Sequence, residues 1–227
     1  MTEVEPLPSR PSAVIFDMDG LLLDSERAIL DCFREAASEQ GADIESDWWL
    51  GMIGLGDAVC RAMLVERIGT PATDQLLERG HARYIAMAEA GLPHRPGVLA
   101  LLDLLALHRI PCAVATSTRS PLAQRKLAAA GLLHRFAHVC TSSDVAQPKP
   151  APDVYLLAAR RLGVEAARCV VLEDSPTGVR AALAAGMTPI QVPDLLTPDA
   201  EARSLGHRIV ASLGAAQALL VPHLALR

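Results

Sequence analysis

Short apolar runs alternate along this chain with helical segments whose ends are marked by proline and glycine. The apolar runs are candidate strands at residues 14–16, 112–115, 138–140, 169–172, 190–192 and 209–210. Proline opens each of the helical segments at about residues 97–108, 121–131, 152–163 and 176–186, and glycine closes the last three. This alternation predicts an α/β fold, with a parallel sheet between helices.

The stretch from residue 25 to residue 92 contains no convincing strand. It shows helical patterns at residues 28–40, 56–68 and 74–90. We therefore expect an inserted α-helical domain at residues 25–92 and an α/β unit built from residues 1–24 and 93–227. Residues 1–12 carry three prolines and are expected to form a flexible tail.

Composition excludes several classes of function. The formal net charge is −5 and no basic stripe occurs, so a nucleic-acid partner is not expected. No apolar run approaches the roughly 18 residues of a membrane span, and no secretory signal is visible. The five cysteines are widely spaced without a C-x-x-C motif, which is typical of reduced, mostly buried thiols in a cytoplasmic protein.

Two carboxylates, Asp17 and Asp19, follow the first apolar run just before Gly20. Side chains two residues apart in extended backbone point the same way, so the two charges repel unless a cation or a shared proton intervenes. The pair indicates a magnesium site, or a division into nucleophile and acid. An acidic turn after a strand is the alternative.

Hydroxyl groups follow the strand at residues 112–115, in the run Thr116, Ser117, Thr118, Arg119. Hydroxyls and backbone N–H groups just before a helix suit an anion such as phosphate. The alternative is a polar turn in which Ser120 caps the next helix.

Lys149 lies between two prolines, in a chain whose other basic residues are arginines apart from Lys126. A lysine where the chain otherwise uses arginine indicates a need for a compact point charge. The alternative is a chance occurrence on an exposed loop. A second acidic pair, Glu173 and Asp174, ends the strand at residues 169–172. The pair could hold magnesium together with Asp17, or supply only a charge at a helix N-terminus.

Asp17-Met-Asp-Gly20, Thr116, Lys149 and Glu173-Asp174 resemble, in order and spacing, the four motifs of the haloacid dehalogenase superfamily. The resemblance covers residues 12–210. It implies a Rossmann-like core, and the helical insert is similar to the small cap of the phosphatase and β-phosphoglucomutase branch.

The resemblance also implies roles for individual residues. Asp17 would be the nucleophile that forms an aspartyl-phosphate, and Asp19 the general acid and base. Thr116 and Lys149 would bind the phosphoryl oxygens. The Mg²⁺ ligands would come from Asp17, the Asp19 carbonyl, Asp174 and Glu173, with Glu173 either holding Lys149 or reaching the ion through water.

Departures from the family pattern favour phosphomonoester hydrolysis. Asp19 argues against dehalogenation, and the absence of lysine from residues 26–91 argues against phosphonate chemistry. A β-phosphoglucomutase-like enzyme would carry a histidine and an arginine where this chain has Ile29 and Asp57. A sugar phosphomutase remains the first alternative, and a non-catalytic phosphate-binding regulatory protein the second.

The substrate would be a small phosphorylated metabolite, such as a sugar, polyol, glycolate or nucleoside phosphate. Ser117, Arg119 and Glu26 are the candidate residues for binding it, and the loop at residues 54–57 could also face the site. Trp48 and Trp49 are expected to pack within the insert, with stacking on a ligand as the alternative. We expect a monomer or weak dimer.

Overall fold

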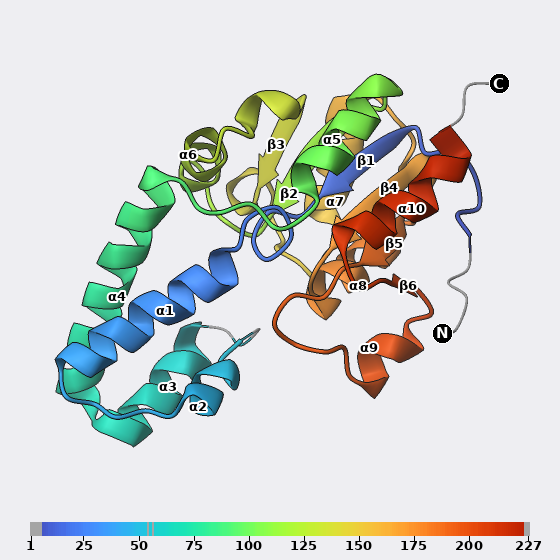
Figure 1. Cartoon of the computed structure of the whole chain (residues 1–227). Coiled ribbons are helices and arrows are strands. Elements are labelled where there is room, and N and C mark those ends of the chain that lie inside the picture. Colours follow the sequence, from blue (N-terminus) through green and yellow to red (C-terminus); the bar gives the residue numbers. More distant parts are fainter. Residues whose placement is uncertain (1–5, 54, 56, 225–227) are drawn as a thin grey trace.

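A computed structural model describes residues 6–53, 55 and 57–224 of the chain. Its centre is a six-stranded parallel sheet with the order β3-β2-β1-β4-β5-β6 (Figure 1). The strands are β1 (Ala13–Phe16), β2 (Cys112–Thr116), β3 (His138–Thr141), β4 (Cys169–Glu173), β5 (Thr188–Gln191) and β6 (Arg208–Ile209). The α/β prediction is therefore confirmed.

Helices cover both faces of the sheet (Figure 1). They are α5 (Val98–Leu107), α6 (Leu122–Ala129), α7 (Asp153–Leu162), α8 (Pro176–Ala184), α9 (Ala200–Ser204) and α10 (Leu213–Leu224), with the short turns η1 (Leu133–Arg135), η2 (Ser142–Asp144) and η3 (Ala166–Arg168). Residues of α5, α6 and α10 share one apolar core with Val14 and Phe16, whereas α7 and α8 share another with Ala13 and Ile15. Successive side chains of β1 thus enter opposite cores, which is why this strand has no polar residue.

The insert consists of α1 (Ser25–Glu39), α2 (Ser46–Leu50), α3 (Asp57–Ile68) and α4 (Thr70–Ala90). It has an apolar core of its own, which includes Phe33, Trp49 and Leu64. Helices α1 and α4 pack closely because Gly80 has no side chain, and a Cβ there would overlap the Phe33 ring. The expected packing role of Trp49 is confirmed, because its side chain is buried in this core.

Prolines and glycines at helix ends, together with the apolar runs, predict most elements to within a few residues. Helix α4 begins at Thr70, earlier than the expected residue 74, because Pro71 is accommodated in its first turn. No sequence pattern predicts helices α2, α9 and α10. The first two have only 5 residues each, and α10 is apolar on all sides, so that no amphipathic period marks it.

The expectation of a flexible tail at residues 1–12 is wrong for its described part. Leu7 is buried in the sheet core, and Arg10 donates hydrogen bonds to the carbonyls of Leu224 and His108. Proline restricts the chain here without excluding it from packing. Residues 1–5 lie outside the described part of the chain. None of the described helices has the length and apolar character needed to span a bilayer.

Candidate active site

The carboxyl ends of three neighbouring strands converge at the centre of the sheet. Strand β1 lies between β2 and β4, and Phe16 is in register with Val114 and Leu172. Asp17 follows Phe16 directly, while Thr116 and Glu173 are the last residues of β2 and β4. Parallel strands end at one edge of a sheet, so residues distant in the sequence meet there.

Three carboxylates form a compact cluster at this edge. Asp17, Glu173 and Asp174 each offer an oxygen atom, and these atoms all lie within 4.8 Å of one another. Gly20 lies close to this cluster, where a Cβ would overlap the Asp174 carboxylate. Gly20 also has a φ of 80°, which glycine adopts without strain. Hard oxygen ligands at this spacing could hold a divalent cation.

Lys149 lies within the carboxylate cluster. Its Nζ donates to Asp17 Oδ1 at 2.6 Å and to Glu173 Oε1 at 2.7 Å. Burial disfavours the ammonium, yet Asp17 and Glu173 outweigh it and raise the pKa of Lys149 well above its ordinary value. Lys149 is therefore a fixed positive charge between two acids.

Glu173 is fully buried and accepts several further hydrogen bonds. Tyr155 Oη donates to Oε1 at 2.9 Å, and the backbone N–H and hydroxyl of Ser175 donate to Oε2 at 2.9 and 3.0 Å. Burial would raise the pKa of Glu173, but Lys149 and these donors lower it overall. Because its oxygens are engaged in this way, Glu173 is suited to holding Lys149 in place.

The other two acids of the cluster have raised pKa values. Burial, together with the charge of Glu173, raises the pKa of Asp17 to about 7, although Lys149 opposes the shift. Burial and the charges of Glu173 and Asp17 raise the pKa of Asp174 well above its ordinary value. Excess negative charge that is removed from water in this way favours a bound cation.

Asp19 lies in a second group of polar side chains beside the cluster. Thr118 Oγ1 donates to Asp19 Oδ2 at 2.6 Å, and Lys126 Nζ donates to Asp19 Oδ1. Burial would raise the pKa of Asp19, but Lys126 and Thr118 lower it overall. The buried Thr116 hydroxyl accepts from the Thr118 N–H at 3.0 Å, which ties the end of β2 to this group.

The sequence patterns do not mark Lys126 or Tyr155 as site residues. Lys126 is one of only two lysines in the chain, so the reasoning applied to Lys149 applies equally to it. Its signal was obscured because it lies within a helix, α6, rather than at a strand end. Tyr155 carries no comparable sequence signal.

The candidate substrate residues lie nearer the surface. Ser117 and Arg119 are exposed, and no hydrogen bond among the described residues joins their side chains to the carboxylate cluster. Glu26 is partly buried, and burial followed by the charge of Asp19 raises its pKa. Residues 54 and 56 of the expected substrate loop lie outside the described part of the chain.

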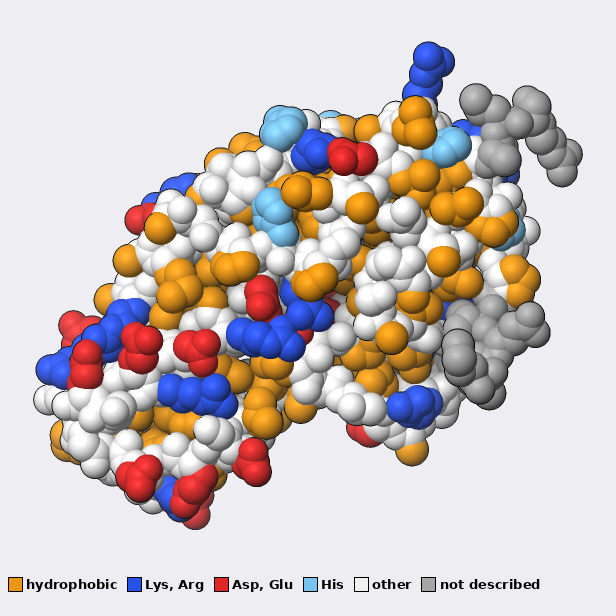
Figure 2. Space-filling model, viewed as in Figure 1, with side chains coloured by type: hydrophobic (Ala, Val, Ile, Leu, Met, Phe, Trp, Pro, Cys, Tyr) orange, Lys and Arg blue, Asp and Glu red, His pale blue; other side chains and the backbone are white. Residues whose placement is uncertain are grey.

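A group of charges lies at the junction of the insert and the sheet unit (Figure 2). Arg27 of α1 pairs with Asp24 at 2.7 Å and with Asp194 at 2.6 Å. Arg95 lies between α4 and α5, where the chain returns from the insert to the sheet unit, and it pairs with Asp194 at 2.8 Å. The connections between the two parts are thus held to the loop that follows β5.

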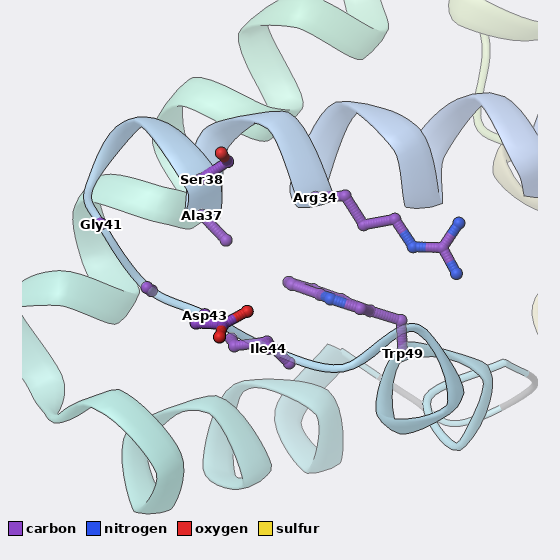
Figure 3. A pocket seen from close by; sticks show the side chains of 8 residues that line it. Arg34, Ala37, Ser38, Gly41, Asp43, Ile44 and Trp49 are labelled. Atoms are coloured by element: carbon purple, nitrogen blue, oxygen red, sulfur yellow. The ribbon is translucent and has the colours of Figure 1, made fainter.

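A pocket in the insert lies apart from these groups (Figure 3). The Trp49 ring forms one side, facing α1, while Asp43 and Ile44 approach from the segment between α1 and α2. None of its lining residues belongs to the carboxylate cluster, so the pocket is not part of the candidate active site.

Comparisons with known proteins agree with this geometry. The family model for haloacid dehalogenase-like hydrolases matches residues 11–186. Fructose-1-phosphate phosphatase YqaB of Escherichia coli is 33% identical over 185 residues, covering 81% of this chain and 97% of the relative.

Two solved structures are also similar. A HAD family hydrolase from Deinococcus radiodurans, with bound phosphate and sodium, has a TM-score of 0.79 and 29% identity, and the match covers 95% of this chain and 97% of that one. A Thermotoga maritima protein, provisionally described as a β-phosphoglucomutase, has a TM-score of 0.78 and 29% identity, with 92% and 97% covered. The chain belongs to the haloacid dehalogenase-like hydrolase family.

Proposed function

We propose that the protein is a magnesium-dependent phosphomonoester hydrolase in which Asp17 is the nucleophile. One observation carries the proposal: Asp17 lies 2.6 Å from the Lys149 ammonium, within a cluster that also contains Glu173 and Asp174. The same cluster supplies a nucleophile, a fixed cation and candidate metal ligands. The match of the chain to a hydrolase family, and its likeness to a named phosphatase, support this reaction.

The acidic cluster fits Mg²⁺ by the chemistry of its donors. Asp17 and Asp174, whose carboxylates have raised pKa values, would hold the ion together with the Asp19 carbonyl. Glu173, engaged by Lys149 and Tyr155, would hold Lys149 rather than bind the ion directly. When bound, Mg²⁺ would neutralise the carboxylates and the phosphoryl oxygens, which otherwise repel each other.

The proposed reaction has two steps. An Asp17 oxygen bonds to phosphorus, the ester P–O bond breaks, and the leaving oxygen takes a proton from Asp19. The negative phosphoryl group beside Asp19 favours the protonated acid that this step needs. A water oxygen then bonds to phosphorus, the P–O bond to Asp17 breaks, and Asp19 takes the proton from the water. Thr116 and Lys149 bind the phosphoryl oxygens throughout.

We propose that the insert at residues 25–92 is a cap domain over a core formed by residues 1–24 and 93–227. Its position beside the strand ends supports a small phosphorylated metabolite as substrate, and the likeness to a fructose-1-phosphate phosphatase favours a sugar or polyol phosphate. Glu26, Ser117 and Arg119 are the proposed substrate contacts. Four of the five cysteines are buried, which supports a cytoplasmic location.

Hydrolysis is favoured over the mutase reaction, to which the Thermotoga maritima neighbour points. Ile29, where a mutase would carry a histidine, packs against the apolar core of the insert. A mutase predicts isomerisation of a hexose phosphate that is primed by the bisphosphate. Release of phosphate without an isomeric product would exclude it.

The test is hydrolysis of p-nitrophenyl phosphate and a panel of phosphorylated metabolites by the purified protein with Mg²⁺. We expect turnover that EDTA and Asp17→Asn both abolish. Asp31→Asn, which removes an exposed carboxylate of helix α1 that is not part of the cluster, serves as the matched control and should retain full activity. Full turnover by Asp17→Asn would refute the nucleophile, and turnover of no phosphomonoester by the wild-type protein would refute the function.

A further inference from the structure

Among the described residues, Lys126 is the one buried charged residue outside the carboxylate cluster. It projects from α6, its side chain is 2% exposed, and it contacts two groups from different parts of the chain. Nζ donates to Asp19 Oδ1 and, at 2.7 Å, to Tyr84 Oη of the insert helix α4. A buried ammonium lowers stability relative to an apolar side chain of similar volume, so packing alone does not explain a lysine here.

The two lysines divide the acids of the site between them. Lys149 pairs with Asp17 and Glu173, whereas Lys126 pairs with Asp19. With Thr118 bound to Oδ2, both oxygens of the Asp19 carboxylate are held. Two bonds to different oxygens of one carboxylate restrict its rotation, and general acid catalysis depends on that orientation.

Tyr84 connects this arrangement to the insert. Its hydroxyl accepts from Lys126, and its ring centroid lies 5.2 Å from the same Nζ. Helix α4 therefore contacts Lys126, the partner of Asp19, directly. The position of the lysine depends on α4 remaining against α6.

We propose that Lys126 is a positioning residue that orients the Asp19 carboxylate toward the leaving oxygen, and that Tyr84 supports it from the insert. The inference rests on the proposed phosphomonoester hydrolysis. Orientation of an acid matters most when the leaving group is a poor one. An alkoxide must be protonated as it departs, whereas p-nitrophenolate departs without a proton.

The experiment compares kcat/KM for a sugar phosphate that the wild-type protein hydrolyses with kcat/KM for p-nitrophenyl phosphate, each variant at its own pH optimum. For Lys126→Met we expect about a 100-fold loss on the sugar phosphate and less than about a fivefold loss on p-nitrophenyl phosphate. Tyr84→Phe should shift the ratio in the same direction by about threefold. Competitive inhibition by inorganic phosphate should be unchanged in both variants.

Arg125→Met is the matched control. Arg125 lies next to Lys126 on α6 and pairs with Glu89 of α4 at 2.8 Å, but it is exposed, and no hydrogen bond or ion pair among the described residues joins it to Asp19. We expect it to change neither rate by more than about twofold. If Lys126→Met fails to fold, Thr118→Val, which removes the other bond to Asp19, tests the same selective loss.

Equal losses on both substrates, or no loss on either, would overturn the positioning role while leaving the hydrolase intact. Failure of the proposed function would look different, because the wild-type protein itself would then hydrolyse neither substrate.

Discussion

Gly178 lies directly against the carboxylate of Glu173, so that a Cβ at position 178 would overlap both carboxylate oxygens. The side chain of Glu173 can therefore lie against the first turn of α8, where it accepts hydrogen bonds from Ser175 and Lys149. The geometry of the site thus depends on the absence of a side chain from a helix.

We expect Gly178→Ala to displace Glu173 and, with it, Lys149. The predicted result is a fall of about 10- to 100-fold in kcat/KM for p-nitrophenyl phosphate, with a loss of about 1–3 kcal/mol in the free energy of unfolding. Steady-state kinetics and urea unfolding measure the two effects. Thr177→Ala, an exposed neighbour on the same helix, should change neither, and wild-type kinetics in Gly178→Ala would contradict this account.

Asp194 should stabilise the junction between the insert and the sheet unit. Its Oδ1 pairs with Arg27 and Arg95, and its buried Oδ2 has no hydrogen-bond partner among the described residues. We expect Asp194→Asn to lower the free energy of unfolding by about 1–2 kcal/mol, a value discounted because the Arg27 side chain is 42% exposed.

Asp103→Asn is the control for the junction. Asp103 also pairs with an arginine, but its side chain is 70% exposed, so we expect a change within about 0.5 kcal/mol. Urea unfolding of the two variants gives the comparison. An equal change in both would show that the buried junction adds no stability of its own.

Gly80→Ala should destabilise the insert although alanine is the better helix former. The new Cβ overlaps the buried Phe33 ring, which costs about 1–3 kcal/mol, against a gain of about 1 kcal/mol in helix propensity. We therefore expect a net loss of up to about 2 kcal/mol in the free energy of unfolding, measured by urea unfolding. In a Phe33→Ala background the same substitution should be neutral or stabilising, and a loss in that background would point to another cause.

Stabilisation by Mg²⁺ should grow with pH up to about pH 7. The pKa of Asp17 is raised from 3.8 to about 7, so without a cation its contribution to stability is present below pH 4 and is lost as pH rises to about 7. A metal ligand must be deprotonated, so the apparent affinity should rise by up to about tenfold per pH unit below pH 7 for each ligand that titrates there, and the pKa of Asp174 is raised as well.

Thermal unfolding with Mg²⁺ or with EDTA, between pH 5 and pH 8, measures this effect. The shift in melting temperature on adding Mg²⁺ should increase with pH up to at least about pH 7. Asp174→Asn, which lacks one proposed ligand, should show little shift at any pH. A shift of equal size at every pH would contradict the involvement of Asp17.

The positions of the main elements follow from local sequence. Proline and glycine mark the ends of α6, α7 and α8, and apolar runs mark the strands. Asp17, Thr116 and Glu173 are identifiable because polar residues at the ends of parallel strands meet at one edge, whatever the strand order. Lys149 is identifiable because it lies between two prolines in a chain with only two lysines. The short helices α2 and α9 escaped prediction because so few residues carry no period.

Local sequence patterns are enough to predict the α/β architecture, the helical insert and the residue types of the site, because these depend on periodicity and on chemistry within a few neighbouring residues. The pairing of each lysine with its acid depends instead on the packing of distant segments. Lys126 meets Asp19 across 107 positions of the chain, and it does so because α6 packs against α4 beside the end of β1. Such a contact arises from the packing of whole helices, and no local pattern encodes it.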